Sequence, residues 1–172
     1  MSLWNRRRML PADVKVSLTL AQGERVLASA QDTAAHWLVG TDRSLHLQEV
    51  GGWVVLPWQR IDRASWAADT ATLTVHAVAD FGHEQPQHQR TVEEPGLFLD
   101  LLHDLVNSTV LLTRHVPFAG SRGLIVVARR PPVGDGAIEW SCQLDETLDP
   151  ADPLVVAAVE RGLANARAEL GP

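Results

Sequence analysis

The sequence predicts an α+β protein: an antiparallel seven-stranded barrel capped by a helix, then a three-stranded β and one-helix extension. From Glu24 onward, short apolar runs alternate with turn residues at close intervals, which is typical of an antiparallel meander. Two later segments, Pro95–Ser108 and Pro153–Leu170, repeat apolar residues at helical spacing. With 172 residues, 45% of them hydrophobic, the chain is long enough to bury a core around these elements.

The first segment, residues 1–23, mixes apolar and basic residues and ends at Gly23. A short helix is expected between Ala12 and Ala21. The residues that can contact an anionic membrane are Trp4, Arg6, Arg7 and Arg8. Chain termini this short are more often solvated ends, so membrane contact is the less favoured interpretation.

Seven strands are predicted within residues 24–108. They are Arg25–Ala30, His36–Thr41, Ser44–Val50, Trp53–Trp58, Arg63–Ala67, Ala71–Val78 and Gln89–Val92. Asp42-Arg43 and Gly51-Gly52 occupy the positions of two-residue hairpin turns. The apolar face of Pro95–Ser108 should pack against these strands and close them into one barrel-like sheet.

The remaining residues, 109–172, should form a small unit of three strands and one helix. The strands are Val110–Phe118, Gly123–Arg130 and Ala137–Asp145. Asp152 is a plausible cap for the last helix, with Pro153 at its first position. Because so small a unit has little core of its own, we expect it to dock on the barrel or on a second copy of the chain, leaving a groove between the units.

Residues 24–108 resemble the bacterial pleckstrin-homology and GRAM-like domains. The likeness rests on seven strands closed by one helix, on Trp37–Leu47 (WLVGTDRSLHL), and on Leu56–Ile61 (LPWQRI). It implies a fold that binds lipids, peptides or partner proteins and seldom catalyses a reaction. Phosphoinositide-binding members carry basic residues on the first hairpin, whereas residues 31–35 (QDTAA) have none. The resemblance therefore does not extend to that ligand.

The segment from Val110 to the C-terminus resembles uncharacterised actinobacterial proteins in its Arg-His-Val-Pro and Ala-Arg-Arg-Pro-Pro runs. A single lysine beside fourteen arginines agrees with a GC-rich genome. Neither likeness implies an activity.

Composition indicates where in the cell the protein is expected and which classes of partner are disfavoured. One cysteine, Cys142, excludes an intramolecular disulfide, and no secretory signal or membrane-spanning run is evident, so a cytoplasmic location is expected. The net charge of −6 disfavours nucleic acid, since basic residues exceed acidic ones only in residues 1–23 and 119–136. We expect a protein partner or a small ligand, and a homo-oligomer remains open.

No catalytic or cofactor-binding motif is present, and no cofactor is expected. The histidines nearest one another are His76, His83 and His88, with Glu84 between the last two. His83, Glu84 and His88 lie in the polar stretch Gly82–Gln89, which is typical of an exposed loop, so solvated histidines are favoured over a metal site.

Candidate binding residues are aromatic or basic. Tryptophans mostly fill cores, but Trp53 and Trp58 are an odd number of positions apart, so one should face outward from the sheet. Arginines gather on the hairpin of residues 110–130, where a solvated rim is favoured over an anion site. The candidate surface comprises Trp53, Trp58, Arg114, His115, Arg122 and Arg129.

The leading functional expectation is a noncatalytic module that binds a protein or a ligand. One alternative is a small enzyme with a site between the two units, using His115, His103 or the His83 and His88 pair. Another is a regulatory protein associated with the membrane through residues 1–23.

Overall fold

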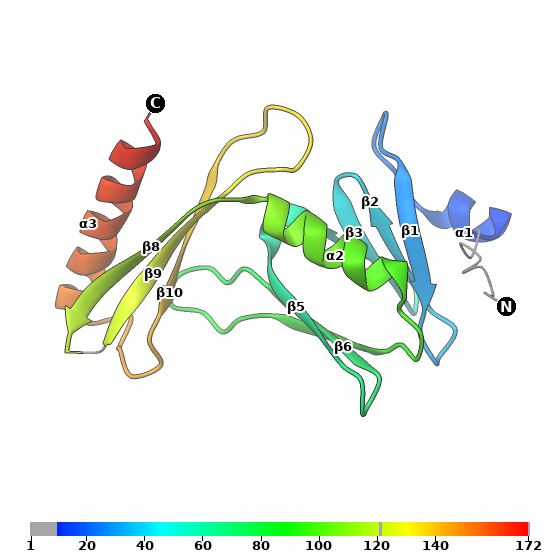
Figure 1. Cartoon of the computed structure of the whole chain (residues 1–172), viewed down its shortest axis with the longest axis horizontal. Coiled ribbons are helices and arrows are strands. Elements are labelled where there is room, and N and C mark those ends of the chain that lie inside the picture. The colour runs from blue at the N-terminus through cyan, green and yellow to red at the C-terminus, as the bar shows by residue number, and fades with distance from the viewer. Residues whose placement is uncertain (1–9, 121, 172) are drawn as a thin grey trace, which may run out of the picture.

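The computed structural model describes residues 10–120 and 122–171, and these form three antiparallel sheets and three α-helices (Figure 1). The molecule is elongated. Helix α1 (Ala12–Ser17) lies at one end, helix α3 (Pro153–Leu170) at the other, and helix α2 (Leu97–Ser108) between them. The α+β class and the antiparallel pairing predicted from the sequence are therefore confirmed.

The first sheet has the order β1-β2-β3-β4. Its strands are β1 (Val26–Gln31), β2 (Trp37–Thr41), β3 (Ser44–Glu49) and β4 (Gly52–Pro57). Asp42 and Arg43 make the β2–β3 turn, as predicted. The β3–β4 turn uses Val50 and Gly51 instead of the two glycines, because Glu49 pairs with Gly52 and Gly51 takes the positive φ of 97°.

The second sheet has the order β5-β6-β7. Its strands are β5 (Ile61–Ala67), β6 (Thr72–Ala77) and β7 (Gln87–Thr91). A 3-10 turn, η1 (Trp58–Arg60), separates it from β4. Within this turn Trp58 is fully buried, and its indole N–H donates to the carbonyl oxygen of Thr41 at 2.9 Å.

The predicted seven-stranded barrel does not close. Its strands are divided between the two sheets, and the β4–β5 ladder needed to join them is replaced by Pro57 and η1. Proline has no N–H to donate, and the 3-10 turn redirects the chain before β5 begins. The sheets are joined instead where Thr33 N–H, after β1, donates to the carbonyl oxygen of Thr91 on β7 at 2.9 Å.

Helix α2 covers both of these sheets and completes the first core. It begins after Gly96, whose φ of 48° favours glycine, so Pro95 precedes the helix instead of opening it as predicted. The helix buries Phe98, Leu102 and Val106 against the sheets. The other fully enclosed members of this core include Leu38, Leu45, Leu47, Trp58, Ile61, Leu73, Val75 and Val92.

The third sheet and α3 form a separate second core. The strands are β8 (Val110–Ala119), β9 (Arg122–Arg129) and β10 (Glu139–Leu144), in the order β10-β9-β8. As predicted, Asp152 caps α3, accepting from Leu154 N–H at 2.8 Å. At Gly162 a Cβ atom would stand 3.0 Å from Val116 Cγ2, so glycine lets the helix approach the sheet closely.

The segment before β1 covers the outer face of the first sheet. Leu10, Val14 and Leu18 pack on Val39, beside partly buried Trp37 and Trp53. Beneath this cover lies His46, 1% exposed, with its Nε2 3.2 Å from Glu24 Oε1. Strand β3 is therefore buried on both faces, which accounts for its unbroken run of enclosed residues.

Candidate functional site

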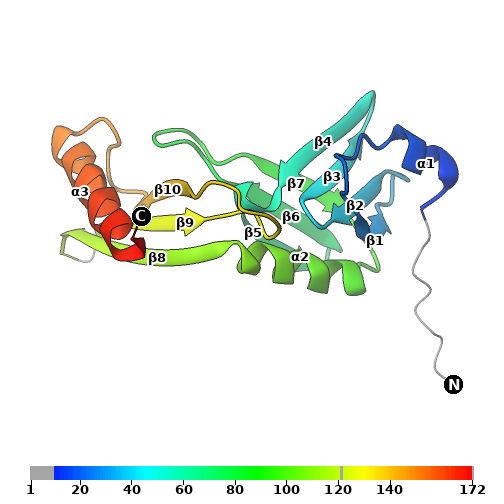
Figure 2. The same ribbon diagram turned by 90° about the horizontal axis from the view of Figure 1, so that it is seen from above.

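A groove of about 910 Å³ lies where the two cores meet. One wall is the β6–β7 connection, residues 78–86, with Gln87 at the start of β7, and the other is β10 with the chain that follows it as far as Pro150. Figure 2 shows this connection extending alongside β10. The walls thus come from the two parts of the chain that bury separate cores.

Asp62 is the structural centre of this junction. Its carboxylate accepts hydrogen bonds from the first unit through Arg63 Nη1 at 3.1 Å and Gln85 Nε2 at 3.0 Å. It accepts from the third sheet through Arg129 Nη2 at 3.3 Å and Gln143 Nε2 at 2.6 Å. Of these donors, Arg63, Gln85 and Gln143 also line the groove, so one buried carboxylate holds side chains of both walls in place.

Arg129 is enclosed at the same junction. It is 6% exposed, and its guanidinium donates to Thr109 Oγ1 at 3.1 Å and to the main-chain oxygen of Asp62 at 3.0 Å. Burial lowers the pKa of Arg129 and the adjacent Asp62 raises it, with a net decrease. The solvated rim predicted for these arginines is wrong for Arg129, which joins the two units; Arg130, its neighbour, is exposed.

A second polar contact joins the units beside the first. Glu139 at the start of β10 accepts from Gln59 Nε2 at 3.2 Å and Arg60 Nη1 at 3.1 Å. Side chains alternate between the two faces of β10. Glu139 and Gln143 therefore point toward the first unit, the two sheets under α2, whereas Trp140, Cys142 and Leu144 pack toward α3.

The groove is polar and its charge is predominantly acidic. Four carboxylates line it, and Arg63 is the one arginine among its lining residues. The carboxylates belong to Asp80, Glu84, Asp145 and Glu146. Hydrogen bonds from Thr147 lower the pKa of Asp145, so that group is anionic at neutral pH. The site therefore favours a cationic ligand.

The titratable groups of the groove do not form a nucleophilic centre. Burial raises the pKa of the Cys142 thiol to about 11, with Arg167 opposing the rise, and the thiol therefore stays protonated at neutral pH. His83 is exposed, and its Nδ1 lies 3.2 Å from the carbonyl oxygen of Phe81. Across residues 10–120 and 122–171, no three His, Cys, Asp or Glu side chains converge as metal ligands would.

His88, from the predicted loop, and the nearby His76 are partly buried, so neither is fully solvated. His88 lies within β7, and burial with the nearby Arg90 lowers its pKa. His76 lies on β6, where burial and Arg63 lower its pKa in the same way. Both imidazoles are therefore neutral at pH 7 and lie partly buried on the second sheet.

The six residues predicted as a binding surface are not brought together. Trp53 is partly buried under the N-terminal segment, where its indole N–H donates to Ser17 Oγ at 3.2 Å, and Trp58 lies in the core. The two tryptophans do lie on opposite sides, as expected, with Trp53 on the outer face of the first sheet, but the segment before β1 covers Trp53 in part, so it is not a freely exposed surface.

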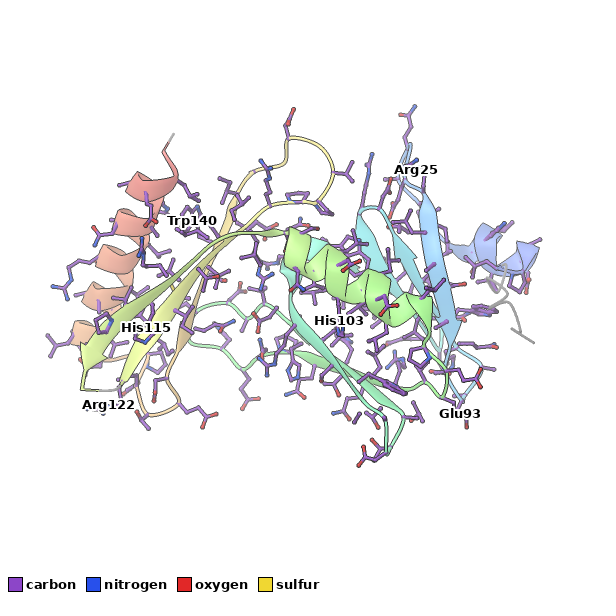
Figure 3. All side chains as sticks on the ribbon, in the orientation of Figure 1. Arg25, Glu93, His103, His115, Arg122 and Trp140 are labelled. Atoms are coloured by element: carbon purple, nitrogen blue, oxygen red, sulfur yellow. The ribbon has the colours of Figure 1, made fainter. Side chains whose placement is uncertain are left out.

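The basic members of the predicted surface are dispersed along the third sheet. Figure 3 shows His115 and Arg122 at the β8–β9 hairpin, far from His103 on α2. Arg114 is exposed and forms an ion pair with Glu169 of α3. Of the six residues, Arg129 alone contributes to the junction. The proposed membrane contacts, Trp4 and Arg6 to Arg8, lie outside the described residues.

Sequence reasoning missed Asp62, Gln85 and Gln143. Asp62 and Gln143 are polar residues in predicted or observed strands and Gln85 lies in a polar loop, and nothing in such patterns distinguishes a buried polar side chain from a solvated one. Their importance arises from residues far apart in the chain, since 81 positions separate Asp62 from Gln143.

No family model, curated protein or solved structure matches this chain. Among the described residues, no helix has the length and apolar character that crossing a membrane requires.

Proposed function

We propose that the chain is a noncatalytic binding module of the cytoplasm, related to the pleckstrin-homology and GRAM-like domains, whose ligand or protein partner occupies the groove between its two units. The observation that carries the proposal is the groove itself, whose walls come from two separately packed cores. Binding sites favour such junctions, and a volume of about 910 Å³ is within the range of ligand sites.

The order of the elements supports the relationship to these domains. A four-stranded sheet, a three-stranded sheet and then an amphipathic helix packed over both follow one another along residues 26–108. The resemblance implies binding of lipids, peptides or partner proteins, although a shared fold does not by itself define the ligand. The Cys142 thiol, protonated at neutral pH, offers no nucleophile to the groove, which supports binding over catalysis.

A fragment screen by NMR tests this function. Small cationic and neutral fragments should shift amide signals of the groove residues, Ser141 and Gln143 among them, more than signals elsewhere. Ser141→Trp should abolish these shifts by filling the groove. Thr113→Trp is the matched control, because Thr113 and Ser141 flank Val127 in the same row of the third sheet but Thr113 does not line the groove. Fragments that shift the same amide signals in Ser141→Trp as in the wild type would refute the proposal.

A further inference from the structure

We infer that the partner recognised at this groove is an extended basic peptide segment of another protein, which adds as a fourth strand to the free edge of β10. The inference rests on the proposed function and narrows it to one class of partner. Three features carry it: the unpaired edge of β10, the absence of protection on that edge, and the charge of the groove.

The free edge of β10 faces the groove. The strand is terminal in the order β10-β9-β8, so within the described residues it pairs on one side only. Six consecutive residues, 141–146, line the groove. Because side chains alternate between faces along a strand, an uninterrupted run of lining residues means that the strand borders the groove with its edge.

The main-chain groups at that edge can be assigned from the register. Asp145 N–H donates to Gly123 O at 3.0 Å, so Asp145 and Gly123 are a hydrogen-bonded pair, and the alternation of antiparallel ladders makes Gln143 and Ser141 bond to β9 as well. The intervening residues Trp140, Cys142 and Leu144 therefore direct their N–H and C=O groups outward. Three donors and three acceptors are thus available to an added strand.

The two edges of the third sheet differ in protection. Strand β8 carries Pro117 and two register shifts, between Val110 and Leu112 and between Pro117 and Ala119, devices that discourage strand addition. Strand β10 pairs from Glu139 to Leu144 without a shift and contains no proline. The unprotected edge is the one that borders the groove.

The acidic lining of the groove favours a basic peptide. The lining carboxylates of Asp80, Glu84, Asp145 and Glu146 outnumber Arg63, the one arginine of the lining. An added strand would direct alternate side chains toward the β6–β7 connection, which carries Asp80 and Glu84, and toward the α3 side of the sheet. Lys or Arg at alternate positions would meet the acidic wall, whereas acidic peptides would be repelled.

The test uses a displayed library of random nine-residue peptides with the full-length protein. Selected peptides should be enriched in Lys and Arg, and on titration they should shift the amide signals of Trp140, Cys142 and Leu144. Glu84→Lys combined with Glu146→Lys should weaken binding at least tenfold, more at low salt than at high salt. Failure to select peptides, or selection of acidic ones, would overturn the inference.

Main-chain pairing is tested by removing single N–H groups. Cys142→Pro deletes an outward N–H and should weaken peptide binding at least tenfold while the protein still unfolds cooperatively, since proline is tolerated on edge strands. If that variant does not fold, peptides N-methylated at alternate residues supply the same test: one alternation should lose binding and the other retain it. Equal binding by both would exclude strand addition.

Two outcomes separate this inference from the function it rests on. Peptides that compete with fragments for the groove but tolerate every N-methylation would leave the binding function intact and overturn strand addition. Concentration-dependent dimers abolished by Cys142→Pro would show that a second copy of β10 is the occupant, which also overturns a basic partner.

Discussion

The guanidinium of Arg129 and the carboxylate of Asp62 form a buried ion pair, 3.3 Å apart, that connects the two units of the chain. Their side chains are 7% and 9% exposed. An enclosed pair of this kind gives little net stability over an apolar pair, but removal of one partner leaves an uncompensated charge. The pair therefore fixes how the units are oriented more than it adds to the stability of either.

Arg129→Met should lower the free energy of unfolding by about 3 kcal/mol, since Asp62 loses its cationic partner from the third sheet. Adding Asp62→Asn to this variant should recover part of the loss. Urea unfolding of the wild type, Arg129→Met and the double variant gives the comparison. Arg130→Met is the matched control and should stay within about 0.5 kcal/mol of the wild type, because Arg130 is exposed. Equal losses at both arginines would contradict this role for Arg129.

Gly162→Val should destabilise the protein by about 1–3 kcal/mol, because its Cβ would stand 3.0 Å from Val116 Cγ2 and 3.3 Å from Val126 Cγ2. Ala164→Val on the exposed side of α3 tests helix propensity alone and should cost about 0.5 kcal/mol. Thermal unfolding measures both. A Gly162→Val protein as stable as Ala164→Val would show that α3 does not pack this closely.

Glu24 should contribute stability that is lost in acid. Burial alone would raise its pKa, but hydrogen bonds from Thr41, Ala21 and His46 lower the pKa below its ordinary value of 4.5. A lowered pKa in the folded state gives stability that is present above the unfolded value and lost as pH falls through the folded one. The stability advantage of the wild type over Glu24→Gln should therefore be full at pH 7 and shrink below pH 4.5.

Denaturation of Glu24→Gln and of the exposed Glu94→Gln from pH 3 to 7 measures that difference. The Glu94 variant should follow the wild type throughout. A gap between wild type and Glu24→Gln that widens toward low pH would reverse the sign expected from the Glu24 contacts.

The Cys142 thiol should react slowly in the folded protein. A pKa of about 11, raised from 9.0, leaves about 100-fold less thiolate near pH 8, and thiolate is the reactive form. Labelling with a disulfide reagent should be at least that much slower in buffer than in 8 M urea. Fast labelling of the folded protein would mean that β10 and α3 separate readily.

Much of the fold was predictable because it depends on local pattern. The alternating runs gave strands within about two residues of their observed ends, and Asp152 with Pro153 placed the start of α3 correctly. Closure of the barrel was not predictable in the same way. It depends on whether β4 and β5 pair, and the chain breaks that ladder with Pro57 and η1.

The contacts between the two units could not be predicted, because they depend on residues far apart in the chain. Arg129 was identified because arginines gather on one hairpin, yet its partner Asp62 is 67 positions away and has no unusual neighbours. Trp53 and Trp58 were selected by residue type, and tertiary packing buried one wholly and the other in part. Residue type indicated which side chains matter, but long-range packing decided where they lie.

Both proposals require that the β6–β7 connection lie against the chain after β10. A Cβ atom on Gly82 would be 3.5 Å from Pro150 Cβ, which is within the range of disulfides. The measurement is disulfide formation in Gly82→Cys/Pro150→Cys, made with Cys142→Ser so that no other thiol competes. We expect an intramolecular disulfide in mildly oxidising buffer, formed more slowly when Arg129→Met is added. Free thiols, or disulfides between molecules only, would contradict a groove walled by these two segments.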